Sequence, residues 1–364
     1  MIRRASLLLI GLLALAGSAP QGAGAAPAPP GFAGISPQSP LTEKDVALMQ
    51  LAGVSSVRMP MNWNAIQPRS RFFNEPDFDG FDHSVRLSAE YGIGVLPVLS
   101  NTPDWLAPDP IDLPIDTAAQ RWAWKSFLRD AARRYGPNGS FWDENPETPY
   151  VPIRQWEIWN EENIVTFANP ASPERFAVLL RLAGRVLHRF DPRAKVLIGG
   201  LFGRPLQIPP NVSSGDFLSR LYRARHVKRY FDGVALHPYV SVAAAMRAQI
   251  ENLRRVMRLH HDAATPLYVT ELGWGSDSGE SRWERGPYGQ AQELDRAFAM
   301  LVGKQRAWRI GGLWWFSWSD EGGACQFCDS AGLLTADREA KPAWYRFNAW
   351  TGGDPDFVPR ASLE

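Results

Sequence analysis

Short apolar segments recur along the chain, and stretches with helical spacing or long loops separate them. Eight such segments can be counted, at 32–36, 54–60, 92–100, 153–161, 194–200, 231–239, 265–274 and 311–318. Strands that alternate with helices form parallel units with right-handed crossovers. Eight such units in 364 residues favour a closed barrel over an open sheet. We therefore predict an α/β fold built as a single (β/α)8 barrel.

The stretches between these segments have apolar residues three and four positions apart. This spacing predicts amphipathic helices at 118–135 and 172–190, and a last helix, "KPAWYRFNAW", closes the fold. With 45% apolar and 21% charged residues, the chain has a normal globular composition and can bury a sizeable core. No linker or composition shift divides it. We predict one barrel domain at 32–350 and a C-terminal tail at 351–364.

The N-terminus has the pattern of a secretory signal. Two arginines precede an apolar run from Leu7 to Ala16, and small residues and prolines follow. We predict a signal peptide at 1–26 and a short Pro-rich linker at 27–31. The apolar run is short for a membrane span, although an uncleaved anchor is the alternative. We expect a secreted bacterial protein, extracellular or periplasmic, with no stable membrane span after cleavage.

Cys325 and Cys328 form the motif "CQFC". In a cytosolic redox protein this spacing would indicate a dithiol. After a secretory signal, a small disulfide that ties down one loop is favoured instead. Two cysteines alone are too few for a structural zinc site. We predict a disulfide between them.

The charge balance does not point to a polyanionic partner. The net charge is +1, and the most basic run, at 220–229, spaces its charges as on a solvated helix. No spacing of His, Asp and Glu indicates a catalytic metal, and the glycines follow no phosphate-loop pattern. We expect no nucleic-acid partner, no metal and no cofactor, and a monomeric protein.

Polar and aromatic side chains lie at the predicted strand ends, where barrels carry their active sites. They are Arg58, Asn160, Glu161, His237, Tyr239, Glu271, Trp315 and Trp318. Glu161 and Glu271 close the fourth and seventh strands. In an eight-stranded barrel, these two acids face one another across the mouth.

Two carboxylates that flank a cleft are what glycoside hydrolysis requires. One is protonated and gives its proton to the leaving oxygen, and the other is ionised and attacks the sugar carbon. The negative charge of Glu271 raises the pKa of Glu161, and this effect disappears once the sugar esterifies Glu271. Glu161 can thus act first as acid and then as base. Retention of configuration needs the carboxylates about 5–5.5 Å apart.

The neighbouring residues suit these roles. Arg58 is expected to favour the ionised form of Glu271, and Tyr239 to donate a hydrogen bond to the same carboxylate. Asn160 is expected to bond a sugar hydroxyl next to the reacting carbon. A Trp face from the eighth strand would give the sugar ring a stacking surface.

Two further acids in "RQWEIWNEEN" are expected to be structural. Glu157 lies within the strand and is predicted to pair with a buried cation, Arg58 or Arg154. Glu162 is expected to be a solvated acid or a contact at the rim of the cleft.

The motifs "WEIWNEEN", "ALHPYV", "YVTELGW" and "LWWFSWSD", in this order, resemble glycoside hydrolase clan A, and most closely families five and thirty-nine. The similarity extends from Phe32 to about Trp350. It implies a retaining enzyme with Glu161 as acid/base and Glu271 as nucleophile. It also implies substrate-binding roles for Arg58, Asn160, His237, Tyr239 and Trp315, with Trp318 as the rival of Trp315.

The third strand departs from the clan pattern. Several clan members have a His at its end, whereas this chain has "LSNTPDW". Asn101 is the candidate for the missing hydroxyl contact. The departure weakens the transfer of substrate specificity from a named family.

Together these features predict a secreted, metal-independent, retaining glycoside hydrolase that acts on an oligo- or polysaccharide. A transglycosylase with the same residues and a glycan-binding barrel without activity are the alternatives. The sequence leaves open the sugar, its linkage and the choice between endo and exo cleavage.

Overall fold

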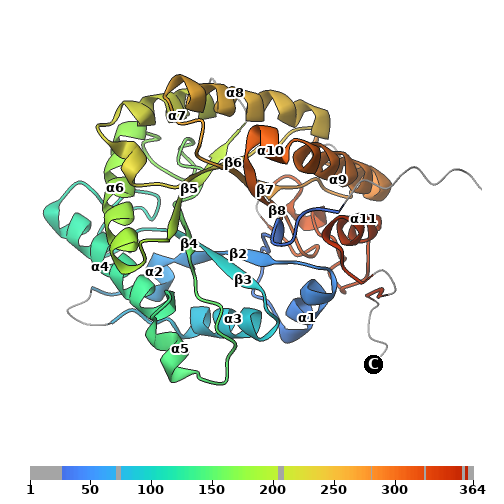
Figure 1. The fold of residues 1–364 in the computed structure, drawn as a ribbon, viewed down its shortest axis with the longest axis horizontal. Coiled ribbons are helices and arrows are strands. Elements are labelled where there is room, and N and C mark those ends of the chain that lie inside the picture. The colour runs from blue at the N-terminus through green and yellow to red at the C-terminus, as the bar shows by residue number, and fades with distance from the viewer. Residues whose placement is uncertain are drawn as a thin grey trace, which may run out of the picture.

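Eight parallel strands close into one barrel, and a ring of helices surrounds it (Figure 1). The structure is a computed structural model that describes residues 27–70, 75–203, 209–279, 281–323, 325–354 and 357–359. The strands pair in chain order from β1 to β8, and β8 pairs with β1. The predicted (β/α)8 TIM barrel is confirmed. The predicted signal at 1–26 lies outside the described residues, as does part of the predicted tail.

Each strand overlaps one of the eight apolar segments. The strands are β1 Ala33–Ile35, β2 Ser56–Asn62, β3 Gly94–Ser100, β4 Gln155–Ile158, β5 Lys195–Phe202, β6 Gly233–His237, β7 Leu267–Leu272 and β8 Ile310–Trp315. The pairing of β7 with β8 shifts register between Val269 and Leu272. This irregularity lies beside one of the two predicted catalytic acids.

Helices follow the strands and form the outer layer. They are α1 Glu43–Leu51, α2 Trp63–Ile66, α3 Asp79–Glu90, α4 Ala118–Tyr135, α5 Ser140–Glu144, α6 Pro173–Phe190, α7 Ser214–Arg223, α8 Met246–Leu259, α9 Gly286–Gly303, α10 Gln305–Trp308 and α11 Pro342–Thr351, with short 3₁₀ helices η1 Val227–Arg229, η2 Ala243–Ala245 and η3 Cys328–Ser330. Within the described ranges, none of the helices has both the length and the apolar character needed to span a bilayer.

Local sequence signals set the helix starts. At α4, the Thr117 side chain accepts from the Gln120 backbone N–H, and the Gln120 side chain accepts from the Thr117 backbone N–H. Such a capping box satisfies two N–H groups that the helix itself leaves without partners. At α6, the Ser172 side chain accepts from the Arg175 backbone N–H, and Pro173 occupies the first turn. These caps place the predicted helices within a residue of their expected starts.

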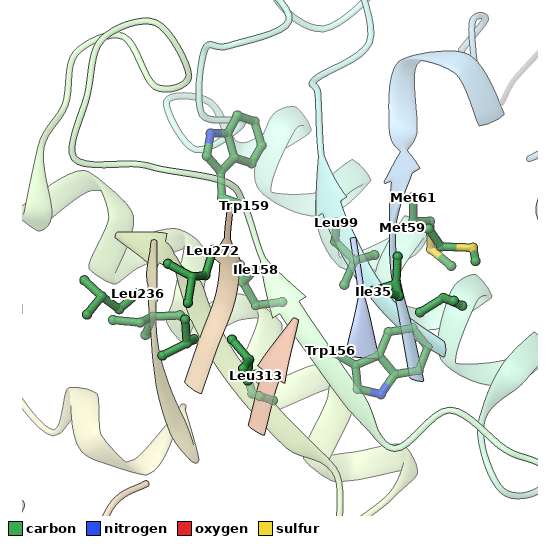
Figure 2. Close-up of a cluster of buried hydrophobic side chains, with 14 of the residues drawn as sticks. Ile35, Met59, Met61, Leu99, Trp156, Ile158, Trp159, Leu236, Leu272 and Leu313 are labelled. Atoms are coloured by element: carbon green, nitrogen blue, oxygen red, sulfur yellow. The ribbon is translucent and has the colours of Figure 1, made fainter. Parts of the chain in front are cut away.

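The strands contribute side chains to both faces of the barrel wall. Side chains that alternate along a strand point to opposite faces, so every second residue packs against the helices. Figure 2 shows this outer cluster, in which Met59, Leu99, Ile158, Leu236 and Leu313 come from five different strands. All five are buried. The apolar layer between strands and helices is thus continuous around the barrel.

The inside of the barrel is apolar near the N-terminal ends of the strands. The residues that form this inner cluster are Leu96, Leu197, Tyr268 and Trp314. Two glycines leave room for the rings: a Cβ on Gly311 would lie 2.4 Å from the Tyr268 ring, and one on Gly34 would lie 2.4 Å from Trp314 Nε1. The inner cluster fills the bottom of the barrel and leaves its C-terminal end for the polar side chains.

Candidate active site

The polar side chains predicted at the strand ends meet at the C-terminal mouth of the barrel. Arg58 lies within β2, Asn160 and Glu161 follow β4, His237 ends β6, Tyr239 follows two residues later, and Glu271 lies in β7. Each of them takes part in a hydrogen bond with another member of the group. The barrel therefore brings together six residues that lie far apart in the sequence.

The chain leaves β4 through an unusual backbone conformation. Trp159 and Glu161 are non-glycine residues with φ angles of 72° and 44°, in the left-handed region. Such conformations cost about 1–3 kcal/mol each and persist where the surroundings enforce them. Here the indole N–H of Trp159 donates to the carbonyl of Phe167 over 2.7 Å. The turn aims Asn160 and Glu161 in different directions at the mouth.

Arg58 is the centre of the charged network. It is buried, and its Nε donates to Glu157 Oε2 over 2.8 Å, while Nη1 donates to Glu271 Oε1 over 2.5 Å. Its Nη2 donates to the amide oxygen of Asn160 over 2.8 Å. The predicted pairing of Glu157 with a buried cation is confirmed, with Arg58 as the partner. Arg154 pairs with Asp191 instead.

Glu271 turns into the mouth at the register shift of β7. Besides Arg58, it accepts a hydrogen bond from the Tyr239 hydroxyl over 2.9 Å. Burial raises the pKa of the Glu271 carboxyl, while the Arg58 charge and the Tyr239 hydroxyl act in the opposite direction. Burial and the nearby carboxylates raise the pKa of Tyr239 well above its ordinary value, so Tyr239 keeps the proton that it donates.

Glu161 has a different environment. Its Oε1 lies 2.8 Å from His237 Nδ1, and the residue is 6% exposed. Burial raises the pKa of Glu161, and Glu271 adds to this effect. Burial also lowers the pKa of His237, so its ring is neutral. Because Glu271 touches a full positive charge and Glu161 touches a neutral ring, Glu271 ionises first.

The two acids are close together. One oxygen of Glu161, one oxygen of Glu271 and a ring nitrogen of His237 all lie within 4.8 Å of one another. In the part of the chain that the structure describes, this is the group whose spacing would suit a metal ion. Arg58 already binds Glu271 there, and its charge opposes a second cation.

One contact at this site has no counterpart in the sequence predictions. The Thr270 hydroxyl lies 3.1 Å from His237 Nε2 and 3.1 Å from Glu157 Oε1. Thr270 is two residues after Tyr268, so both side chains point into the barrel. Counting alternate positions back from Glu271 gives Val269 and misses Thr270, because the register of β7 shifts between Val269 and Leu272. A threonine in a strand also gives no signal by residue type.

A cavity of about 330 Å³ opens beside these residues. Arg58, Asn160 and Glu271 line it, and so does Asn101, which the sequence singled out as a hydroxyl contact. Because the oxygen of Asn160 accepts from Arg58, its amide N–H groups are left to face the cavity. The aromatic part of the wall consists of Trp159, Phe167 and Phe316.

Neither predicted tryptophan of the eighth strand reaches this cavity. Trp315 is fully buried, and Trp318 is buried and donates its indole N–H to Asp45 over 2.9 Å. The period of two in the strand explains this outcome: Trp314 points inward, Trp315 points outward, and Phe316 points inward again. The expectation of a Trp stacking face is therefore wrong in position, because Phe316 takes the place at the cavity wall.

Glu162 is not the solvated acid or rim contact that the sequence suggested. It is fully buried, and neither of its carboxyl oxygens has a hydrogen-bond partner among the described residues. Its side chain points at β5, where a Cβ on Gly199 would lie 2.2 Å from Oε2. Burial raises the pKa of Glu162 well above its ordinary value. Burial thus favours the neutral form of this carboxyl.

The "CQFC" loop closes one side of the site. Cys325 and Cys328 form a disulfide, as predicted. The Cys328 carbonyl accepts a hydrogen bond from Gln38, which lines the cavity. Phe327, between the two cysteines, packs edge-to-face on Tyr239. The disulfide loop thus supports both the rim of the cavity and a hydrogen-bond donor to Glu271.

No family model matches the sequence, and no curated protein matches it. Solved structures match in fold. The structural neighbours include family 39 glycoside hydrolases. One, from Bacteroides cellulosilyticus, is 19% identical with a TM-score of 0.62, and the match covers 90% of this chain and 65% of that protein. This chain therefore spans less than two thirds of that enzyme.

Two further neighbours have related names. A monomeric β-xylosidase from Caulobacter crescentus is 15% identical with a TM-score of 0.61, and the match covers 89% of this chain and 69% of the β-xylosidase. An intracellular xylanase from Thermoanaerobacterium saccharolyticum is 15% identical with a TM-score of 0.58, and the match covers 87% of this chain and 94% of the xylanase. At these identities the likeness establishes the common barrel. The resemblance to family thirty-nine, first seen in the motifs, is thereby confirmed in the fold.

Proposed function

We propose that this protein is a secreted glycosidase that cleaves O-glycosidic bonds with retention of configuration. The observation that carries the proposal is the pair of acids, whose nearest oxygens lie within 4.8 Å. Retaining enzymes hold their carboxyl groups about 5–5.5 Å apart, whereas inverting enzymes separate them by roughly 6.5–9.5 Å to admit a water. The opposite surroundings of Glu161 and Glu271 assign one role to each.

In the first step, Glu271 attacks the anomeric carbon of the sugar. Arg58 and Tyr239 keep this carboxylate ionised and oriented through hydrogen bonds to its two oxygens. Glu161 gives its proton to the leaving oxygen. Asn160, fixed by Arg58, donates to a sugar hydroxyl beside the reacting carbon. The bond to the leaving group breaks as the bond to Glu271 forms.

In the second step, water cleaves the ester between the sugar and Glu271. The ester carries no charge, so Glu271 no longer adds to the rise in the pKa of Glu161 that burial causes. Glu161, now ionised, takes a proton from water, and the hydroxide attacks the sugar carbon. Glu271 leaves as a carboxylate, and its contacts with Arg58 and Tyr239 are restored. Two inversions give net retention.

We infer that the substrate is an oligo- or polysaccharide. A second cavity of about 740 Å³ adjoins the catalytic one, and Pro37, Gln38 and Pro60 line both. His83 and Asn62 provide polar groups in the second cavity. A chain of sugars that occupies the first cavity can therefore continue into the second. His83→Ala should lower turnover of long substrates and leave aryl monosaccharides unaffected, and equal losses would contradict this extension.

The predicted signal peptide supports secretion, and the Cys325–Cys328 disulfide agrees with it, because disulfides persist in oxidising compartments. Expression of the full chain followed by mass spectrometry of the exported protein tests this part. A new N-terminus near residue 27 is expected. Recovery of the protein with its first residues intact would favour the uncleaved anchor.

The central experiment is a screen of the purified protein on aryl glycosides and polysaccharides, with the Glu271→Ala variant as the blank. Xylosides and glucosides come first, because the structural neighbours include xylosidases, a xylanase and a glucosidase. Proton NMR of the first product should show the anomer of the substrate. The opposite anomer would contradict retention, and binding without turnover would favour the glycan-binding alternative. Product analysis with an added acceptor sugar distinguishes hydrolysis from glycosyl transfer.

A further inference from the structure

The catalytic cavity lies to one side of the two acids. Its walls come from strands β1 to β4, β7 and β8 and from the loops that follow them, and no described residue of β5 or β6, or of the loops after them, lines it. Glu271 and Asn160 are part of the wall, whereas Glu161 is not. The sector of the mouth above β5 and β6 is therefore separate from this cavity.

The chemistry of the proposed function, on which this inference rests, directs the leaving group toward that sector. The nucleophile and the acid flank the bond that breaks, so the attacked sugar lies against Glu271 and the leaving oxygen lies at Glu161. A sugar chain in the catalytic cavity continues into the second cavity along Pro37 and Gln38, which line both. The leaving group must then extend the other way, past Glu161.

Phe202 is the last residue of β5 and lies at the mouth in this sector. Leu201 belongs to the apolar layer outside the barrel wall, so the alternation along the strand turns Phe202 inward. There its ring lies 6.3 Å from the ring of Tyr239, with an angle of 34° between the two planes. Phe202 is only half-buried. Part of its ring thus packs on Tyr239, and the rest is left for another group at the mouth.

Asn163 ties Phe202 to the turn that carries Glu161. The amide oxygen of Asn163 accepts from the Phe202 N–H over 2.8 Å, and its NH2 group donates to the Phe202 carbonyl over 3.1 Å. Phe202 also pairs with His237 across the sheet, and His237 Nδ1 lies 2.8 Å from Glu161. The position of the ring is therefore fixed relative to the acid that protonates the leaving oxygen.

We propose that Phe202 is the stacking surface for the sugar that leaves, and that it thereby determines which leaving groups the protein accepts. A flat aromatic ring offers an apolar face, which suits the C–H face of a sugar. The ring of Phe202 covers one side of this sugar while Glu161 protonates the oxygen between the two sugars. A leaving group without a ring cannot stack and gains nothing from Phe202.

Three β-xylosides with the same sugar and different leaving groups test the proposal: the fluoride, the nitrophenyl xyloside and xylobiose. Phe202→Leu keeps an apolar side chain against Tyr239 and removes the flat ring. It should lower kcat/KM about 10-fold on xylobiose and on the nitrophenyl xyloside, mainly by raising KM. The fluoride should be unaffected, and Phe202→Trp should restore the loss. If the screen selects another sugar, its fluoride, nitrophenyl glycoside and disaccharide take their place.

The nitrophenyl substrate separates stacking from acid catalysis. Its leaving oxygen needs little protonation, so damage to Glu161 through His237 would spare it and lower xylobiose alone. Damage to Glu271 through Tyr239 would lower all three substrates, the fluoride included. Either pattern, or no loss at all, would overturn the proposal. Phe167→Leu is the matched control: this residue is 38% exposed in the wall of the catalytic cavity, and its loss should affect all three alike.

Binding decides the matter if wild type cleaves none of these substrates. Calorimetric titration with xylotetraose should then show about 10-fold weaker affinity for Phe202→Leu than for wild type. That result would leave the stacking surface in place while the proposed function fails. Equal affinities would overturn the stacking surface, and a wild-type protein that neither cleaves nor binds the sugars would overturn both proposals.

Discussion

The two halves of the barrel interior bury different kinds of side chain. At the bottom, Leu96, Leu197, Tyr268 and Trp314 form an apolar cluster. Toward the mouth, the inward positions of β2, β4, β6 and β7 are charged or polar: Arg58, Glu157, His237 and Thr270. All eight residues are buried, so burial alone does not separate the halves. The halves differ in whether the buried side chains need hydrogen-bond or ion-pair partners.

The lower half gains free energy from burial, whereas the upper half needs hydrogen bonds to offset the cost of burial. In the upper half, Arg58 alone makes contacts with Glu157, Asn160 and Glu271. Removing one member of such a network leaves another buried and unpaired. The comparison predicts that changes above alter chemistry and its pH dependence, and that changes below alter stability alone.

The largest effect is expected for Glu271→Ala. Loss of a nucleophile lowers kcat on the order of 10⁴-fold or more, because no other group at the mouth can attack the sugar carbon. Arg58 keeps its contacts with Glu157 and Asn160, so the fold should remain. Steady-state kinetics and circular dichroism check both parts. If activity survives in a folded variant, the nucleophile is misassigned.

Glu161→Ala should have a smaller effect that depends on the substrate. General acid catalysis contributes about 10²- to 10⁴-fold, so natural glycans with poor leaving groups should lose that much. Activated aryl glycosides should lose less in the first step, since their leaving oxygen needs little protonation. Pre-steady-state kinetics on both substrates measures the difference. Equal losses would argue against the acid role of Glu161.

A change in the lower half should separate stability from chemistry. Trp314→Ala removes a large buried ring from the inner cluster and should cost about 3–5 kcal/mol of unfolding free energy. The leaving-group dependence and pH profile of the folded variant should match wild type. Denaturant unfolding and kinetics below the transition test this. A changed pH profile would mean that the two halves are coupled, against the comparison.

The sequence predicted the barrel framework well for physical reasons. Apolar segments at regular intervals identified eight strands, and apolar spacing identified helices whose starts Thr117 and Ser172 cap in the structure. These signals are local, and packing agrees with them. The two acids were also identifiable, because a barrel brings all strand ends together whatever the loops between them.

The rest of the site depends on features that a residue type does not reveal. Phe316 faces the cavity where Trp315 was expected, because the alternation of side chains along the strand, and not its composition, decides which ring faces inward. Thr270 went unnoticed because its contacts are with residues on two other strands, which residue type does not reveal. Glu162 was misplaced because the left-handed conformation of Glu161 redirects the chain after β4.

The smallest effect is expected for Glu162→Gln. This change tests what it costs in stability to bury a carboxyl without a partner in the upper half. The pKa of Glu162 is raised by burial, so the folded protein holds its proton where the unfolded chain, with a pKa near about 4.3, releases it. The stability from this group is complete below the unfolded pKa and is lost as the pH rises toward the folded pKa.

Glu162→Gln removes the titration and keeps the shape. The melting temperature of Glu162→Gln minus that of wild type should therefore increase by a few degrees from about pH 5 to about pH 8, because the unfolded carboxyl of wild type ionises over this range. Glu147→Gln, at an exposed position, is the matched control and should shift equally at both pH values. Parallel melting temperatures for wild type and Glu162→Gln would mean that the carboxyl ionises at no cost in the fold, and the upper half would then lose its clearest case of burial without a partner.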